Sequence, residues 1–203
     1  LLQLHQDLDR NLDYISDSTK REERRKEIIA EVEQIRDKIP SDLRVVKSYN
    51  YQKNSIDFDF EEAIREYLKS KGLTANDDLI ERMRKKNEKI QNYISVSNTV
   101  RHLEIDYDSS KDKITLVTKK IDFKNKSFDM VFEIIPKTIA DNSSKVHFIT
   151  ENIVISSDPI FGIEVSKIKD DKIVYYLEGL LNMEDVEKSD SLPFDEGVPQ
   201  EKL

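Results

Sequence analysis

Hydrophobic positions near the amino end follow a helical spacing. They step by three and four in two stripes, and the second stripe contains pairs a heptad apart, which is typical of the narrow seam of a coiled coil. We predict a coiled-coil helix over residues 1–39 that pairs with another chain, because one chain alone cannot cover so narrow a seam. The seam residues are Leu1, Leu4, Leu8, Leu12, Ile15, Ile28, Val32, Ile35 and Ile39.

A charged stretch separates the two stripes. Residues 17–27 hold nine charges in eleven positions and no hydrophobic side chain, which fits either a solvated helix or a break. Acidic and basic residues alternate at the spacings that stabilise a helix surface, so we interpret the basic ones as part of a solvent face rather than a phosphate-binding patch. Pro40 is expected to end the helix.

The pattern then changes twice before the first long strand. Residues 40–60 show no helical period and are predicted to be a connector, whose aromatic side chains either cover a small core or bind a partner peptide. Residues 61–95 regain a helical period, with Gly72 as a C-cap and a capping-box start at 74–77. They are expected to form a helical segment that leads into a folded head.

From Thr99 onward the hydrophobic period becomes two, and β-branched and aromatic residues dominate, which indicates strands. Short polar turns between them favour an antiparallel meander, closed by a helix over residues 172–183. The acidic end, residues 184–203, is expected to be a disordered tail. Strands are predicted over residues 100–107, 113–119, 127–135 and 145–156.

Alternation within these strands assigns the two faces of the sheet. One face is polar and is expected to remain in solvent, available to a partner; it carries Glu104, Asp106, Thr115, Lys119 and Glu133. The other face is apolar and is expected to be buried under the flanking helices. It carries Leu103, Ile105, Ile114, Leu116, Phe128, Met130, Phe132, Ile134, Phe148 and Ile153.

Composition supports an α+β protein with a modest core. The 203 residues are 37% hydrophobic and 36% charged, against about 45–50% apolar and about 25% charged in an average globular domain. One small folded domain, residues 96–183, plus long water-facing helix is therefore expected. The absence of Cys excludes disulfides, thiolate metal sites and a cysteine nucleophile, and fits a reducing compartment.

The charge balance argues against general nucleic-acid binding. Lys and Arg number 33 against 41 Asp and Glu, for a formal net charge of −8, whereas binding to a phosphate backbone needs a basic surplus. An alternative remains, a nucleic-acid or chromatin binder that uses basic patches at residues 82–86 and 111–126. No apolar run approaches the roughly 20 residues needed to span a bilayer, so no membrane segment is expected.

The sequence contains no recognisable catalytic or cofactor motif. Its His residues, at positions 5, 102 and 147, fall in different predicted elements without metal-ligand spacing, and are expected at the surface or at sheet edges. The Gly residues are isolated, so a phosphate-binding loop is not indicated. We therefore expect no enzyme activity, no cofactor and no metal site.

Several strand and turn segments resemble the head of kinetochore RWD proteins. The similarity extends at most over residues 100–183 and includes the position of the Asp158–Pro159 turn. The segments are Leu103-Glu104-Ile105, Lys113-Ile114-Thr115-Leu116-Val117, Ile121-Asp122-Phe123-Lys124-Asn125 and Phe128-x-Met130-x-Phe132.

Within that family the chain looks most like the smaller centromere-proximal subunit of the Ndc-type complex, or a Zwint-like or monopolin-type relative. The resemblance implies an RWD-like antiparallel sheet flanked by helices behind N-terminal coiled-coil helices. It also implies a non-catalytic adaptor at the nuclear kinetochore, joined in a hetero-oligomer to another coiled-coil/RWD subunit and contacting other kinetochore proteins.

Overall fold

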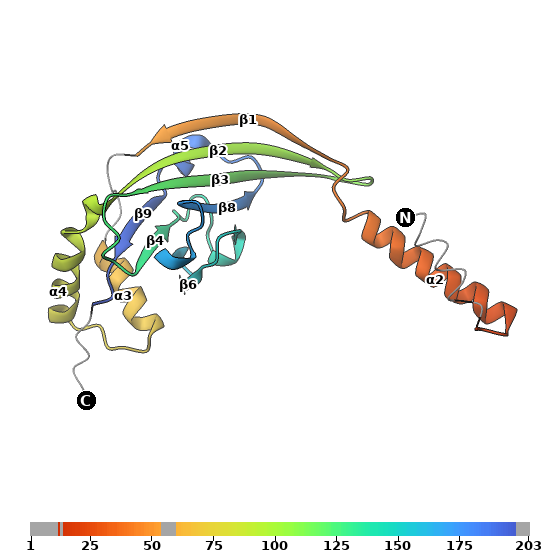
Figure 1. Cartoon of the computed structure of the whole chain (residues 1–203), viewed down its shortest axis with the longest axis horizontal. Helices are drawn as coiled ribbons and strands as arrows, with labels where there is room; N and C mark the ends of the chain where they lie inside the picture. The colour runs from red at the N-terminus through yellow and green to blue at the C-terminus, as the bar shows by residue number, and fades with distance from the viewer. Residues whose placement is uncertain (1–11, 13, 54–59, 198–203) are drawn as a thin grey trace. The chain divides into compact units, whose positions relative to one another are not determined.

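The computed structural model describes residues 12, 14–53 and 60–197 (Figure 1). The predicted seam residues Leu1, Leu4 and Leu8 lie outside this part. The chain divides into two compact units, Leu1–Arg44 with Ile105–Asp112, and Val45–Glu104 with Lys113–Leu203.

The longer described helices lie in the first half of the chain, and most of the described strands follow them. The helices are α2 (Ser18–Arg36), α3 (Phe60–Ser70), α4 (Asp77–Glu88) and α5 (Met183–Val186), with 3-10 turns η1 (Gln91–Tyr93), η2 (Ser143–Lys145) and η3 (Val165–Lys167). The strands are β1 (Asp42–Gln52), β2 (Ile94–Asp106), β3 (Lys111–Phe123), β4 (Met130–Ile134), β5 (Val146–Phe148), β6 (Ile153–Ser156), β7 (Ile160–Glu164), β8 (Lys172–Glu178) and β9 (Asp190–Phe194).

Helix α2 ends before Pro40, as predicted, but it begins only at Ser18. Residues 14–17 are not helical, so the helix predicted over residues 1–39 is interrupted just before α2. The Asp17 carboxylate caps it by accepting hydrogen bonds from the backbone N–H groups of Thr19 (2.9 Å) and Lys20 (3.3 Å), donors that a helix start otherwise leaves unpaired. Of the two interpretations of residues 17–27, the solvated helix is therefore correct. None of the residues of α2 is buried, and its pairing with another chain stays a prediction.

The first sheet has five strands in the order β1-β2-β3-β8-β5. Strand β1 corrects the predicted connector, because residues 42–52 pair as an edge strand and place Tyr49 and Tyr51 against the core. Strand β8 corrects the predicted closing helix at 172–183. Its alternation buries Ile173, Tyr175 and Leu177, and this period-two pattern outweighs the apparent helical spacing.

The second sheet has four antiparallel strands in the order β6-β7-β4-β9. Strand β9 corrects the predicted disordered tail, since Leu192 and Phe194 are fully buried within it. The prediction followed overall composition, but a short alternating segment is enough to cover the free edge of β4. The predicted strand at 145–156 is two strands, β5 and β6, which belong to different sheets.

Three layers build the larger unit. One face of the first sheet packs on one face of the second, and helices α3 and α4 cover the other face of the second sheet (Figure 1). As predicted, Met130, Phe132 and Ile134 lie buried, in the cluster formed with these helices. Ile153, expected in the same buried set, is 46% exposed. The fold is α+β with antiparallel sheets, as expected.

Candidate functional site

The predicted coiled-coil seam becomes more exposed toward its carboxyl end. Leu12 is buried, Ile28 and Val32 are half-buried, and Ile35 and Ile39 are 61% and 58% exposed. Ile15 is also half-buried. We call the stripe formed by Ile28, Val32 and Ile35 of α2, together with Ile39 just after the helix, the α2 ridge.

The basic patch at residues 82–86 is largely neutralised on the surface of α4, where three of its four cations pair with carboxylates. Arg84 pairs with Glu81 at 2.8 Å and also with Glu88, while Lys85 lies 3.0 Å from Glu81. Lys86 pairs with Asp195 at 2.8 Å. A patch in which most cations are already matched by carboxylates attracts phosphate weakly.

The second basic patch, residues 111–126, is also reduced by pairing. Lys111, Lys113 and Lys126 each lie 3.3 to 3.6 Å from a carboxylate. Lys119 is only 1% exposed, so it cannot contribute to a surface patch. These two observations remove most of the local surplus on which the nucleic-acid alternative depends.

Lys119 and Glu133 form an ion pair between the two sheets. The Nζ atom of Lys119 lies 2.5 Å from Oε1 of Glu133, and the two side chains are 1% and 0% exposed. Thr115, on the same face of β3 as Lys119, is also fully buried. The expectation that Thr115, Lys119 and Glu133 form a polar solvent face is therefore wrong, because the second sheet covers this face of the first.

Two hydroxyl groups complete the surroundings of the Glu133 carboxylate. Tyr175 donates a hydrogen bond to Oε1 at 3.1 Å, and Ser191 donates to Oε2 at 2.6 Å. The Lys119 ammonium also donates to the Ser191 hydroxyl oxygen at 3.2 Å. We call these four residues the inter-sheet network; they come from β3, β4, β8 and β9, two strands of each sheet.

Burial dominates the electrostatics of the inter-sheet network. It raises the pKa of Glu133 above the ordinary value, although the Lys119 ammonium and the hydrogen bonds from Ser191 and Tyr175 oppose this rise. Burial likewise raises the pKa of the Tyr175 hydroxyl. Because every donor of the network points at one carboxylate, the arrangement holds charge in place between the sheets.

A polar cavity of about 440 Å³ opens beside Lys119, and we call it the Lys119 cavity. Lys53, Lys124 and Asp190 also line it, together with Asn98. Lys53 and Asp190 pair at 2.8 Å, with side-chain exposures of 14% and 4%. The cavity therefore borders two largely buried ion pairs.

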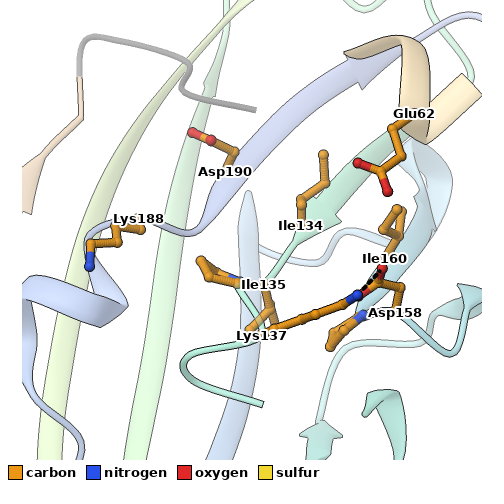
Figure 2. A pocket seen from close by; sticks show the side chains of 10 residues that line it. Glu62, Ile134, Ile135, Lys137, Asp158, Ile160, Lys188 and Asp190 are labelled. Carbon is orange, nitrogen blue, oxygen red and sulfur yellow. Dashed lines mark ion pairs between the residues drawn. The ribbon is translucent and has the colours of Figure 1, made fainter. Parts of the chain in front are cut away.

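A second cavity, of about 450 Å³, also has Asp190 in its lining (Figure 2). Its lining includes Ile134 and Ile160 as well as the ion pair between Lys137 and Asp158, which measures 2.8 Å. Figure 2 shows the Glu62 carboxylate reaching from α3 toward that ion pair. This cavity is mainly a hydrophobic hollow with charges at its rim.

The described His residues differ from the expectation in one case. His102 is 9% exposed and contacts the Tyr49 ring edge-on, with 5.5 Å between ring centroids. His147 is partly exposed and stacks on Tyr176.

In the described part of the chain, no three or more His, Asp or Glu side chains gather in a way that would hold a metal ion. The described helices also include none with the length and apolar character of a membrane span.

Comparison of the chain with protein-family models, with curated proteins and with solved structures finds no match. The site must therefore be interpreted from its own chemistry.

The sequence analysis missed the inter-sheet network, yet a signal for it exists. Glu133 interrupts the apolar run of residues 130–135, and a strand hydrophobic on both faces is buried on both faces. A carboxylate there requires a buried cation.

Proposed function

We propose that the protein is a non-catalytic interaction subunit that binds a partner helix through the α2 ridge. The observation that carries this proposal is a helix of 19 residues in which no residue is buried, although its apolar side chains follow a coiled-coil spacing. Isolated helices are marginally stable in water, and helices in proteins gain most of their stability by packing an apolar face against another element. A partner helix on the ridge would supply that packing.

Strand β1 adds a second feature suited to a partner. It forms an edge of the five-stranded sheet, and Leu43, Val45 and Val46 are 58%, 58% and 52% exposed. An edge strand with exposed apolar side chains can accept an extended peptide by strand addition. The ridge and the edge thus support binding rather than catalysis.

The finer form of the proposal follows the resemblance to kinetochore RWD proteins. In that form the partner is another coiled-coil/RWD subunit, the assembly is a hetero-oligomer, and the site of action is the kinetochore. The similar strand and turn segments at residues 100–183 support it, while the pairing of cations in both basic patches makes nucleic-acid binding the weaker alternative.

Sedimentation equilibrium of the full chain, alone and mixed with candidate coiled-coil/RWD subunits, tests the proposal. We expect a dimer or a stable complex that Ile35→Lys weakens, because a charge on the ridge would have to be buried at the interface. Ala30→Lys is the matched control, since it adds the same charge on the opposite face of α2.

Circular dichroism would establish that both variants remain folded. A folded monomer that binds none of the candidates would contradict the proposal. Equal weakening by the two variants would also contradict it, because the effect would then come from net charge rather than from the ridge.

A further inference from the structure

The Lys119 cavity contains polar groups that the protein leaves unused. The side chains of Gln91, Asn92 and Asn98 line it and form no hydrogen bond with a described residue. Asn98 is only 4% exposed, and its Oδ1 atom is closed to solvent and has no partner in the described part of the chain. Buried polar atoms without partners are uncommon in folded proteins, and a bound ligand or water is a usual explanation.

The charge of this cavity is positive. Three lysines, Lys53, Lys119 and Lys124, line it, whereas Asp190 is its one acidic lining residue in the described part. Lys53 pairs with Asp190, and Lys119 pairs with Glu133. Lys124 is exposed and makes no ion pair with a described residue, so a positive charge remains at the cavity.

Lys119 retains hydrogen-bonding capacity despite its burial. An ammonium group has three N–H donors, and Glu133 and Ser191 accept two of them. The third donor has no partner among the described residues. The side chain is held by its two bonds, so it would bind a ligand with little further loss of conformational freedom.

We propose that the Lys119 cavity binds a small anion, a phosphate or a carboxylate carried by a polar molecule. Lys124 and the third donor of Lys119 would bind the anionic oxygens. The carboxamides of Gln91, Asn92 and Asn98 would recognise adjacent hydroxyl or amine groups. The volume of about 440 Å³ falls within the range of about 300–1,000 Å³ that is common for small-molecule sites.

This site goes beyond the proposed function and does not depend on it. The α2 ridge can pair with a helix whether or not the cavity is filled. Loss of partner binding would therefore leave the ligand proposal untouched, and the reverse also holds.

Amide chemical-shift titration of the full chain tests the proposal, with sodium phosphate and sodium citrate as separate probes and sodium chloride at matched ionic strength. We expect saturable shifts of the Asn92, Asn98 and Lys124 amides with at least one of the two probes. Saturable shifts with phosphate alone would indicate a phosphate site, and saturable shifts with citrate alone would indicate a carboxylate site.

Two variants make the test specific, one just after the end of β3 and one within this strand. Lys124→Gln should weaken binding about tenfold or more, because a hydrogen bond to a charged group is lost. Lys120→Gln removes the same charge from an exposed position outside the cavity and should leave the affinity unchanged.

Three results would overturn the proposal. The first is the absence of saturable shifts with both probes. The second is a set of shifts scattered over surface lysines rather than gathered at the cavity. The third is equal weakening by the two variants, which would show that only the overall charge matters.

Discussion

Phe132 and Glu133 are neighbours on β4, and both are completely buried, but they lie in opposite kinds of surroundings. Phe132 faces the helices and stacks on Phe194, with 4.1 Å between ring centroids. Glu133 faces the first sheet and pairs with Lys119. One strand therefore separates an apolar cluster from an ionic one.

The contrast shows that equal burial does not mean equal stabilisation. Each apolar contact around Phe132 removes hydrocarbon surface from water and is favourable by itself. The ion pair must first offset the loss of hydration of both charges. Such buried pairs often stabilise a fold no more than hydrophobic residues of similar size would. We expect the two clusters to respond differently to substitution.

The largest expected effect belongs to the apolar cluster. Phe132→Ala should lower the free energy of unfolding by about 3–5 kcal/mol, because it removes a large side chain and leaves a cavity. Urea unfolding followed by circular dichroism would measure the change. Met130→Leu nearby should cost less than about 1.5 kcal/mol, since the volume is nearly conserved; a similar loss for both variants would contradict the cavity explanation.

The ionic cluster should respond to pairs of substitutions rather than to single ones. Lys119→Met leaves a buried carboxylate without its cation and should destabilise the fold by about 3–5 kcal/mol. Adding Glu133→Leu should recover most of this loss or more, because the remaining charge is removed as well. A double variant that loses as much stability as the two single variants together, measured by the same urea unfolding, would show that the two side chains are not coupled and would contradict this expectation.

The raised pKa of Glu133 predicts a pH dependence of known sign. The folded protein holds the proton of the Glu133 carboxyl group more tightly than the unfolded chain does. In the unfolded chain the pKa of this group is near its ordinary value of 4.5. The contribution of Glu133 to stability should therefore be fully present below pH 4.5 and fall as pH rises from 4.5 through the folded pKa. Glu81 is exposed, and its pKa is lowered by Lys85 and Arg84. Its contribution to stability therefore has the opposite pH dependence and is lost as pH falls.

Unfolding measured across pH 4 to 8 in the wild type and in Lys119→Met/Glu133→Leu isolates this contribution. The stability of the wild type relative to the double variant should decrease as pH rises above 4.5. An increase over that range would mean that the ion pair lowers the folded pKa of Glu133 instead.

The smallest expected effect lies outside both clusters, at the start of α2. Asp17→Ala removes the capping carboxylate and should weaken the first turn by about 1 kcal/mol. Amide hydrogen exchange at residues 19–21 should become faster, while the sheets stay unchanged. Ser16→Ala, one residue before the cap, is the control, and faster exchange in that variant would argue against the capping role.

Local signals predicted the elements of this fold better than they predicted its layers. Gly72 has φ of +71°, which fits the C-cap deduced from its position, and the helices that follow and precede it were both expected. The alternation at residues 127–135 also predicted the burial of Met130, Phe132 and Ile134 in β4, but not that of Glu133. These features depend on residues that are close together in the sequence, so they can be predicted from the local sequence pattern.

The arrangement of two sheets depends on distant segments and could not be read in the same way. Lys119 lies between two polar residues, Thr118 and Lys120, so a solvent-facing side chain is the ordinary expectation, and only the second sheet makes it buried. Strand β9 offers just Leu192 and Phe194 as apolar signals within an acidic segment. Its burial follows from the free edge of β4, which lies far earlier in the chain.

The position of β9 has a consequence for folding during synthesis. Segments far apart in the sequence must meet before the second sheet is complete, and β4 leaves the ribosome well before β9. Until β9 arrives, Glu133 lacks the Ser191 hydroxyl and Phe132 lacks its stacking partner Phe194. The nascent chain therefore exposes a charged and an aromatic surface on one strand until β9, which emerges later, covers both at once.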